Sequence, residues 1–265
     1  MTGFSFDPLV SLSGFLVGSL VGVTGVGGAS LMTPLMVLLF GIHPATAVGT
    51  DLLYAAITKM AGAAVHHRHG HIRWRLVGLL AIGSVPATAL TLWLMSGVDR
   101  KSAHSVSMLT TSLGIMLMMT AMILLFRDVF MRFELNWLKK HRSPEPRTIA
   151  IATVVLGIVL GTVVTLTSVG AGAIGVTVLL FLYPRSSIND IVGSDIAHAI
   201  PLTLIGGIGY FIIGDLNWVL LGSLLIGSIP GIVLGSLAAP RLPERAIRIT
   251  LAVILVIVAS KLIAI

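Results

Sequence analysis

The sequence predicts an all-α integral membrane protein with two inverted repeats, in which each repeat has a glycine-broken re-entrant or short helix hairpin followed by three transmembrane helices. The first observation is composition: 56% of the 265 residues are hydrophobic and 10% are charged, whereas about a quarter of a soluble domain is charged. The second is that several apolar runs exceed the ~18 residues typical of a transmembrane helix. The third is that the two halves align with each other, and that both contain a glycine-rich break.

The two halves match in three blocks. The aligned pairs are GFLVGSLVGVTGVGGAS (14–30) with GIVLGTVVTLTSVGAGA (157–173), VGTDLLYAA (48–56) with VGSDIAHAI (192–200), and IRWRLVGLLAIGSVP (72–86) with LNWVLLGSLLIGSIP (216–230). The offset is 143 residues in the first block and 144 in the others. This register predicts one membrane domain, with an N-terminal repeat over 1–126, a cytoplasmic linker over 127–147 and a C-terminal repeat over 148–265.

Each half follows the same expected order of elements. An apolar stretch reaches the glycine break, a short apolar stretch follows the break, and three long segments come next. The expected segments are 9–23, 30–41, 45–65, 75–96 and 104–126 in the first half, and 150–166, 173–184, 188–212, 217–239 and 245–264 in the second. The residues around each break are too many for one span of about 20 residues and too few for two. A hairpin there makes no net crossing, so three spans per half predict opposite orientations for the halves.

The basic residues support this topology. With an odd number of crossings per half, 13 of the 17 Lys and Arg residues fall on one side and three on the other, with Lys59 inside the membrane. If each break were part of a single span, the split would be 10 against 6. Because positive charge accumulates on the cytoplasmic side, the odd count is favoured. The chain is therefore expected to be a multi-pass protein of a bacterial inner membrane, with a cytoplasmic linker and both termini outside.

The glycine breaks are the candidate anion site. Irregular backbone at membrane depth is tolerated where protein or a water-filled cavity satisfies it. A short helix is expected to begin after each break, and the free N–H groups of a helix N-terminus attract anions. The candidate substrate-binding residues are Thr24, Gly25, Gly27, Gly28 and Ser30 in the first break, and Thr167, Ser168, Gly170 and Gly172 in the second. The alternative is that these glycines serve tight helix packing and that the hydroxyls bond to nearby carbonyls.

Polar side chains at equivalent positions of the repeat extend this candidate site. Asp51 follows Thr50 and Asp195 follows Ser194, near the start of a long helix in each half. These four residues are expected either to cap helix ends or to couple transport to protons. Two further candidates for contact with an anion are Lys59 and His198. Their alternatives are a salt bridge for the lysine and a hydrogen-bonded core position for the histidine.

The run HHRHGHIRWR (66–75) raises the possibility of a metal site, since it contains four histidines. Neighbouring arginines repel cations, and no carboxylate in the run completes a ligand set. A basic loop in contact with lipid headgroups is therefore the favoured interpretation. No metal and no cofactor are expected.

Five segments resemble the TauE/SafE sulfite exporter family, also called the 4-toluene sulfonate uptake permease family. They are TGVGGASLMTP (24–34), AVGTDLLYAAITK (47–59), VHHRHGHIRW (65–74), TSVGAGAIG (167–175) and VGSDIAHAIPLTLIGGIGYFIIGDLNW (192–218). The resemblance runs through nearly the whole chain. It implies transport, often export, of sulfite, organosulfonates or related sulfur-containing or carboxylate anions. The chain has no cysteine, so the cysteine chemistry of thiosulfate-uptake relatives is not expected.

The expected function is a secondary transporter for small sulfur-containing anions, most simply an exporter. Alternating access and coupling to protons or to the membrane potential are expected, and no nucleotide-binding loop is present. The alternatives are an anion channel and, less favoured, an intramembrane enzyme based on Asp51 and Asp195. The expected partners are the small anion and the lipid bilayer, with a homo-oligomer left open and no nucleic acid.

Overall fold

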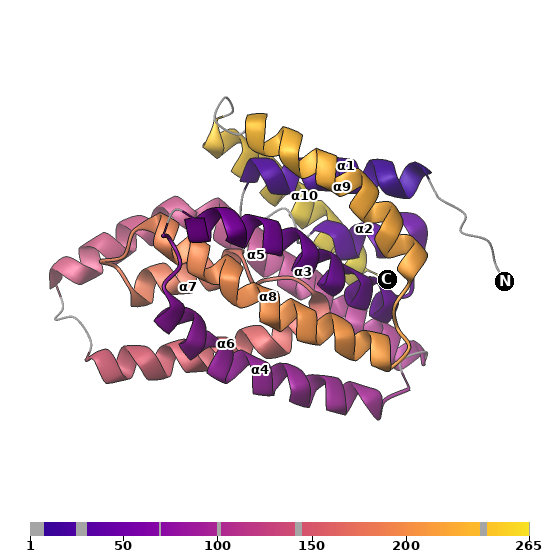
Figure 1. Cartoon of the computed structure of the whole chain (residues 1–265), viewed down its shortest axis with the longest axis horizontal. Coiled ribbons are helices and arrows are strands. Elements are labelled where there is room, and N and C mark those ends of the chain that lie inside the picture. The colour runs from indigo at the N-terminus through magenta and orange to yellow at the C-terminus, as the bar shows by residue number, and fades with distance from the viewer. Residues whose placement is uncertain are drawn as a thin grey trace.

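The structure is a computed structural model that describes residues 8–24, 31–68, 70–99, 102–140, 145–238 and 243–264. In these residues it contains ten α-helices and no strand, as the composition predicts (Figure 1). The first half holds α1 (Pro8–Thr24), α2 (Met32–Phe40), α3 (Pro44–Arg68), α4 (Trp74–Ser96) and α5 (Ala103–Lys140). The second half holds α6 (Pro146–Thr167), α7 (Ala173–Leu182), α8 (Ile188–Ile212), α9 (Trp218–Ala238) and α10 (Glu244–Ile263).

The helices follow the order expected from the sequence. In each half a helix precedes the glycine break, a short helix of 9 or 10 residues follows it, and three longer helices complete the half. The segment predicted as a linker begins in helix, because α5 continues to Lys140.

Five helices of the described residues are long and apolar enough to cross a membrane. They are Trp74–Ser96, Ala103–Phe126, Pro146–Thr167, Ile188–Ile212 and Trp218–Gly235. The two other long helices, α3 and α10, are not among them. α3 carries Asp51 and Lys59 in its apolar length, and it packs against α8, α9 and α2.

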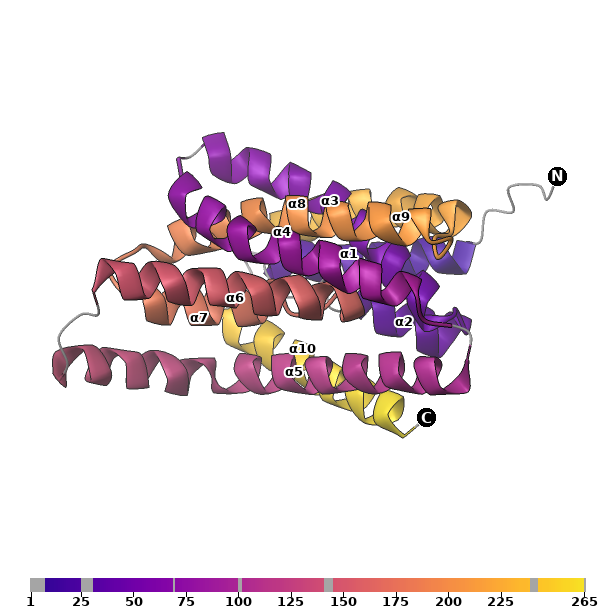
Figure 2. The ribbon, with the colours of Figure 1, turned by 90° about the horizontal axis from the view of Figure 1, so that it is seen from below.

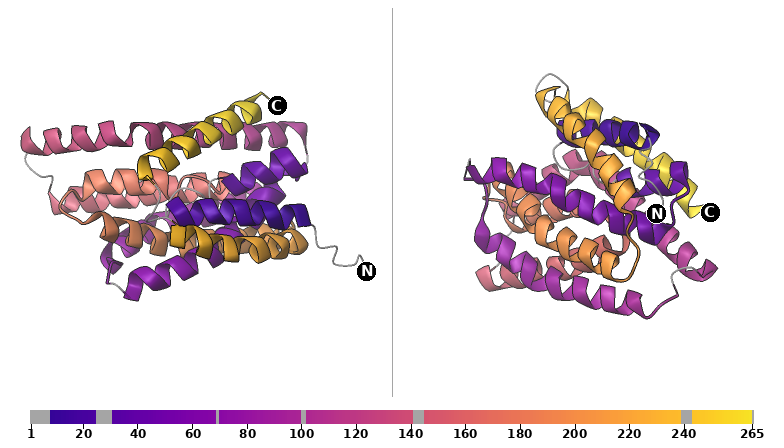
Figure 3. Two further views of the ribbon diagram at one scale, coloured as in Figure 1. Left: turned by 90° about the horizontal axis from the view of Figure 1, so that it is seen from above. Right: turned by 45° about the vertical axis from the view of Figure 1, so that its right-hand side comes forward.

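The main helix pairs each join one half of the chain to the other. α1 packs along α9, α4 along α6, α3 along α8 and α5 along α10. Figure 2 shows α4 beside α6, and the left view of Figure 3 shows α1 beside α9 and α10 crossing α5. In the sequence alignment α1 corresponds to α6 and α4 to α9. The pairs α1–α9 and α6–α4 are therefore the same contact made twice.

Small residues allow these two pairs to approach closely. Gly14 lies against Leu224 and Gly18 against Ser228 in the α1–α9 pair, and the Ser11 hydroxyl donates to the Ser223 carbonyl at 2.7 Å. Along this contact the residue numbers of α1 and α9 increase in the same direction, so the two helices are parallel. Without a hydrophobic driving force between helices in lipid, such close backbone contact is a main source of association.

The central pair α3–α8 has the opposite direction. Gly49 lies against Tyr210, whereas Gly206 lies against Leu52. Numbers that rise along α3 therefore meet numbers that fall along α8, and the two helices are antiparallel. Since α3 and α8 are equivalent helices of the repeat, this is where the two halves meet face to face.

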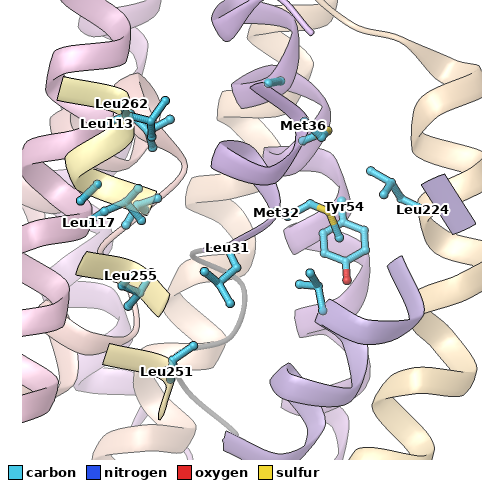
Figure 4. Close-up of a cluster of buried hydrophobic side chains, with 14 of the residues drawn as sticks. Leu31, Met32, Met36, Tyr54, Leu113, Leu117, Leu224, Leu251, Leu255 and Leu262 are labelled. Carbon is cyan, nitrogen blue, oxygen red and sulfur yellow. The ribbon is translucent and has the colours of Figure 1, made fainter. Parts of the chain in front are cut away.

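Both short helices are enclosed by longer ones. Leu31, Met32 and Met36, at and after the start of α2, belong to a buried cluster with Tyr54 of α3. Figure 4 shows this cluster, to which α5, α9 and α10 contribute Leu113, Leu117, Leu224, Leu251, Leu255 and Leu262. A second cluster surrounds α7 with side chains of α4, α6 and α8, among them Leu80, Leu160 and Ile191. The starts of α2 and α7 are therefore inside protein, where their polar groups need protein partners.

Two glycines of α4 offer a matched test of this packing. A Cβ at Gly83 of α4 would clash with the Val154 carbonyl oxygen of α6, whereas a Cβ at Gly78, on the same helix, would meet open space. We expect Gly83→Ala to destabilise the protein, since overpacking costs ~1–3 kcal/mol. We expect Gly78→Ala to be neutral or to stabilise it, by up to ~1 kcal/mol from helix propensity. Thermal unfolding in detergent, followed by tryptophan fluorescence, measures both. Equal melting temperatures for the two variants would contradict the close contact.

Candidate functional site

Asp51 of α3 holds the start of α2. The Thr33 hydroxyl donates to Asp51 Oδ2 at 2.5 Å, and the Thr33 backbone N–H faces the same carboxyl group. Leu31, the residue before α2, has no side chain that caps this helix. A buried carboxyl group from a neighbouring helix therefore satisfies the free donors of the first turn.

Asp195 of α8 takes the corresponding place in the second half. A Cβ at Gly175, in the first turn of α7, would clash with Asp195 Oδ1. The carboxyl group thus lies directly against the start of the short helix, and Gly175 leaves the room for it. Asp195 is buried, and no described residue makes a hydrogen bond to its Oδ1.

The expected capping by these two residues needs a correction in one respect. The sequence places Asp51 and Asp195 near the start of their own helices, but α3 begins at Pro44 and α8 at Ile188. Each carboxyl group therefore belongs to the eighth residue of its own helix, in the third turn, where the backbone N–H groups already donate within the helix. They face the first turns of α2 and α7 instead, because those short helices pack against α3 and α8.

Thr50 and Ser194 link the two halves by their hydroxyl groups. The Ser194 Oγ accepts from the backbone N–H of Arg73 at 2.9 Å, just before α4. The Thr50 Oγ1 accepts from the backbone N–H of Asn217 at 3.4 Å, just before α9. Each residue serves the start of a helix in the opposite half, so the capping role expected for them has a geometric basis across the repeat.

The second glycine break turns sharply between α6 and α7. Ser168 has φ 57° and Gly170 has φ 108°, both in the left-handed region. The Thr167 hydroxyl donates to the Val163 carbonyl at 2.8 Å and accepts from the Val169 N–H at 3.2 Å. Its hydroxyl is therefore engaged within its own segment, as the packing alternative expects.

Ser168 differs from its neighbour because its hydroxyl is directed out of the break. It faces the Asp51 carboxyl group of the first half, and no described residue completes a hydrogen bond with its Oγ. A break in the second half and a helix start in the first half thus meet at one point.

Lys59 lies near both carboxyl groups. It interacts electrostatically with both Asp51 and Asp195, and it stands eight residues, or about 12 Å, along α3 from Asp51. In the part of the chain that the structure describes, the one ion pair within 4.0 Å joins Arg73 to Asp190. The lysine is therefore near both carboxyl groups without a direct ion pair to either.

His198 and Tyr54 occupy equivalent positions and face equivalent serines. The His198 Nε2 and the Ser84 Oγ lie 2.8 Å apart, and the Tyr54 hydroxyl faces Ser228. His198 also faces Lys59, and its Nδ1 has no hydrogen-bond partner among the described residues. Sequence reasoning did not select Tyr54, Ser84 and Ser228 as site residues, although the repeat alignment pairs 54 with 198 and 84 with 228 and could have done so.

The first glycine break is outside the described residues, and so are Gly25, Gly27, Gly28 and Ser30; Thr24 ends α1, and its side chain is not described. The second break is described in full, including Gly172, the N-cap residue of α7. Among the described residues, no three His, Asp or Glu side chains lie close enough together to bind a metal ion. His67 of the histidine run packs edge-on against Trp74, with ring centroids 5.9 Å apart.

The Asp51–Thr33 contact can be measured by its effect on stability. Thr33→Val leaves a buried carboxyl group without its hydroxyl donor, so we expect a loss of ~1.5–3 kcal/mol. The matched control is Thr120→Val in α5, because the buried Thr120 hydroxyl has no partner among the described residues. That change should be neutral or stabilising. Unfolding in denaturant and detergent gives both values, and an equal loss in the two variants would argue against the cap.

The chain has clear relatives among membrane transporters. It is 38% identical over 254 residues to "Probable membrane transporter protein YjnA" of Bacillus subtilis, which covers 96% of this chain and 98% of the relative. It is 33% identical over 226 residues to "Probable membrane transporter protein YdhB" of the same organism, covering 82% and 84%. A Haemophilus influenzae protein with the same description is 25% identical over 219 residues, covering 80% and 76%. No solved structure matches the chain significantly.

The family model named "Sulfite exporter TauE/SafE" matches residues 10–262. This range contains both repeats and every helix that contributes to the site. The resemblance drawn from the motifs is confirmed, and the chain is a membrane transporter that belongs to the TauE/SafE sulfite exporter family.

Proposed function

We propose that the protein is a secondary transporter that exports small sulfur-containing anions, such as sulfite or an organosulfonate, through a site between the two glycine breaks. The observation that carries the proposal is the position of Lys59. Its ammonium group lies near both buried carboxyl groups and forms an ion pair with neither of them. A lysine at this depth is costly unless it meets a partner or a substrate.

The surroundings of Lys59 suit an oxyanion. Hydroxyl groups of Ser168, Ser84 and Tyr54 converge from three different elements on the groups near the lysine. The starts of α2 and α7 add partial positive charge beside Asp51 and Asp195. A sulfite or sulfonate group has three oxygens that accept hydrogen bonds, so it can use the ammonium and several hydroxyl donors together. The family description, sulfite exporter, supports the same class of substrate and the outward direction.

The arrangement of the helix pairs supports inverted repeats and alternating access. If the halves are related by a two-fold axis in the membrane plane, equivalent helices at the axis run antiparallel, as α3 and α8 do. The excess of basic residues on one side then places the central linker in the cytoplasm and both termini outside.

Hydrogen bonds join the two halves at both ends of the central α3–α8 pair. Ser194 is bonded to Arg73 at one end, and Thr50 to Asn217 at the other. The Arg73 side chain adds an ion pair with Asp190 and a hydrogen bond to Ser186 at its end. We propose that opening the site toward one side of the membrane breaks these interactions at that end, while those at the other end remain.

Counterflow in proteoliposomes tests the transport proposal. Vesicles loaded with unlabelled sulfite should accumulate labelled sulfite transiently, as a carrier does, and unlabelled isethionate should compete. We expect Lys59→Gln to reduce the rate at least ~10-fold, because a charge-assisted contact worth ~1.5–3 kcal/mol is lost. Lys261→Gln, an exposed position in the last turn of α10, is the matched control and should leave the rate unchanged.

The possible results separate three cases. Counterflow that survives Lys59→Gln would remove the lysine from the site. Flux without counterflow, together with large unitary currents, would favour the channel alternative over a carrier. Absence of flux for sulfite and for isethionate would contradict the proposed substrate class.

A further inference from the structure

We propose that the cluster of Asp51, Asp195 and Lys59 takes up one proton with each monovalent anion, so that the protein carries anion and proton together with no net charge. This inference rests on the proposed transport function and on the same site. It adds the coupling ion, the stoichiometry and the residues that hold the proton.

The two carboxyl groups of the cluster are buried, and Lys59 is partly buried. Asp51 and Asp195 are 0% and 1% exposed, and Lys59 lies near both without an ion pair. Among the described residues, the titratable side chains that face the cluster are Tyr54, on the same helix as Asp51, and His198, on the same helix as Asp195. Thr33 and Ser168 contribute neutral hydroxyl groups.

Charge balance fixes how many protons the empty cluster holds. Two carboxyl groups and one amine are neutral when two protons are shared among the three groups. This is true whether the cluster is two carboxylic acids with a neutral amine, or one acid, one carboxylate and an ammonium. Any other number of protons leaves a net charge in a buried site, which is the costly condition in a membrane.

The same balance applies when an anion is bound. A monovalent anion adds one negative charge, and only a third proton restores neutrality. The loaded cluster is then two carboxylic acids, one ammonium and the anion. One proton and one anion therefore enter from the same side and leave together on the other side, and the empty cluster returns with its two protons. Export then proceeds when the ratio of internal to external anion concentration exceeds the ratio of external to internal proton concentration.

The hydrogen bonding of the carboxyl groups leaves room for these protons. Asp51 Oδ2 accepts from Thr33, whereas Asp51 Oδ1 has no partner among the described residues. Asp195 Oδ1 is likewise without a partner in the described part of the chain. A proton can therefore be added to either group without breaking the contact that holds α2 or displacing α7.

A divalent anion would need a fourth proton. His198 can supply this further base, because its Nδ1 has no described partner and its ring faces Lys59. Its Nε2 is already engaged with Ser84. A permanently divalent anion such as sulfate should therefore be carried more slowly than a sulfonate of similar size.

Proton movement in proteoliposomes tests the proposal. The probe is isethionate or methanesulfonate, whichever exchanges faster, since both remain monovalent from about pH 5 to 8 and any proton that moves must be held by the protein. An internal pH dye and radiolabelled anion report the two fluxes. We expect one proton per anion, accumulation up to tenfold for one pH unit acid outside, and no effect of a potassium–valinomycin potential.

Replacing the carboxyl groups separates their roles. Asn keeps the oxygen that accepts from Thr33, so the cap on α2 is retained in Asp51→Asn. Either Asp51→Asn or Asp195→Asn leaves one carboxyl group, which can still take the coupled proton, so each single variant should keep the 1:1 ratio. By the same charge balance, the double variant is neutral with an unprotonated Lys59 when empty and with an ammonium when an anion is bound, so it should also keep the 1:1 ratio. In Lys59→Gln the two carboxylic acids are neutral when empty and have no site for a third proton, so the remaining anion flux should move no proton and should follow the potential. Asp99→Asn, at an exposed position after α4, is the control.

Each result has a definite meaning. Anion flux in the wild-type protein that moves no proton and follows the potential overturns this inference but leaves the transport function intact. A Lys59→Gln variant whose remaining flux still carries one proton per anion removes this cluster as the proton site. Failure of sulfite, isethionate and methanesulfonate to exchange at all contradicts the transport proposal itself. If Lys59→Gln does not fold, the wild-type ratio alone decides.

Discussion

The start of a short helix inside a membrane protein is the constraint on which this structure depends. The first N–H groups of such a helix have no partner within the helix, and lipid cannot supply one. A helix that spans the membrane begins at the surface instead, where water can accept from these groups. In the first half a buried carboxyl group from the next helix meets this need, through Asp51 and Thr33. In the second half Asp195 lies against Gly175 at the start of α7, although its Oδ1 accepts no hydrogen bond from a described residue. The enclosing clusters around α2 and α7 then hold each short helix against its carboxyl group.

The two halves repeat one framework and differ in a few side chains at its centre. The serines at 84 and 228 are kept, but His198 stands where the first half has Tyr54. Lys59 corresponds to Thr203, whose hydroxyl donates to the Ala199 carbonyl within its own helix. The framework thus supplies two equivalent helix starts, and the exceptions supply one cation and one imidazole. The chemistry of the site comes from these departures from the repeat.

Much of the fold could be predicted because it depends on local sequence. The apolar runs, the glycine breaks and the register of the repeat gave the order and approximate bounds of the helices. For the site, the sequence indicated which residues could contribute but not which of them contact one another. Periodicity shows that Asp51 is inside α3, but it does not show that α2 begins beside it. Likewise, capping by Thr50 and Ser194 could be expected, but their targets, Asn217 and Arg73, belong to the opposite half. Tertiary packing decides such partners, and one sequence does not encode them locally.

The packing of α1 against α9 also has a consequence for synthesis. Ser11 and Ser223, which hydrogen-bond across this pair, are 212 residues apart in the chain. At roughly 5–20 residues per second, the ribosome needs about 10–40 s to make the partner of α1 after α1 itself. During that time the glycine-lined face of α1 has no native partner. Its equivalent, α6, finds α4 already made. Helices α3 and α5 also precede their partners α8 and α10, but α1 waits longest for its partner.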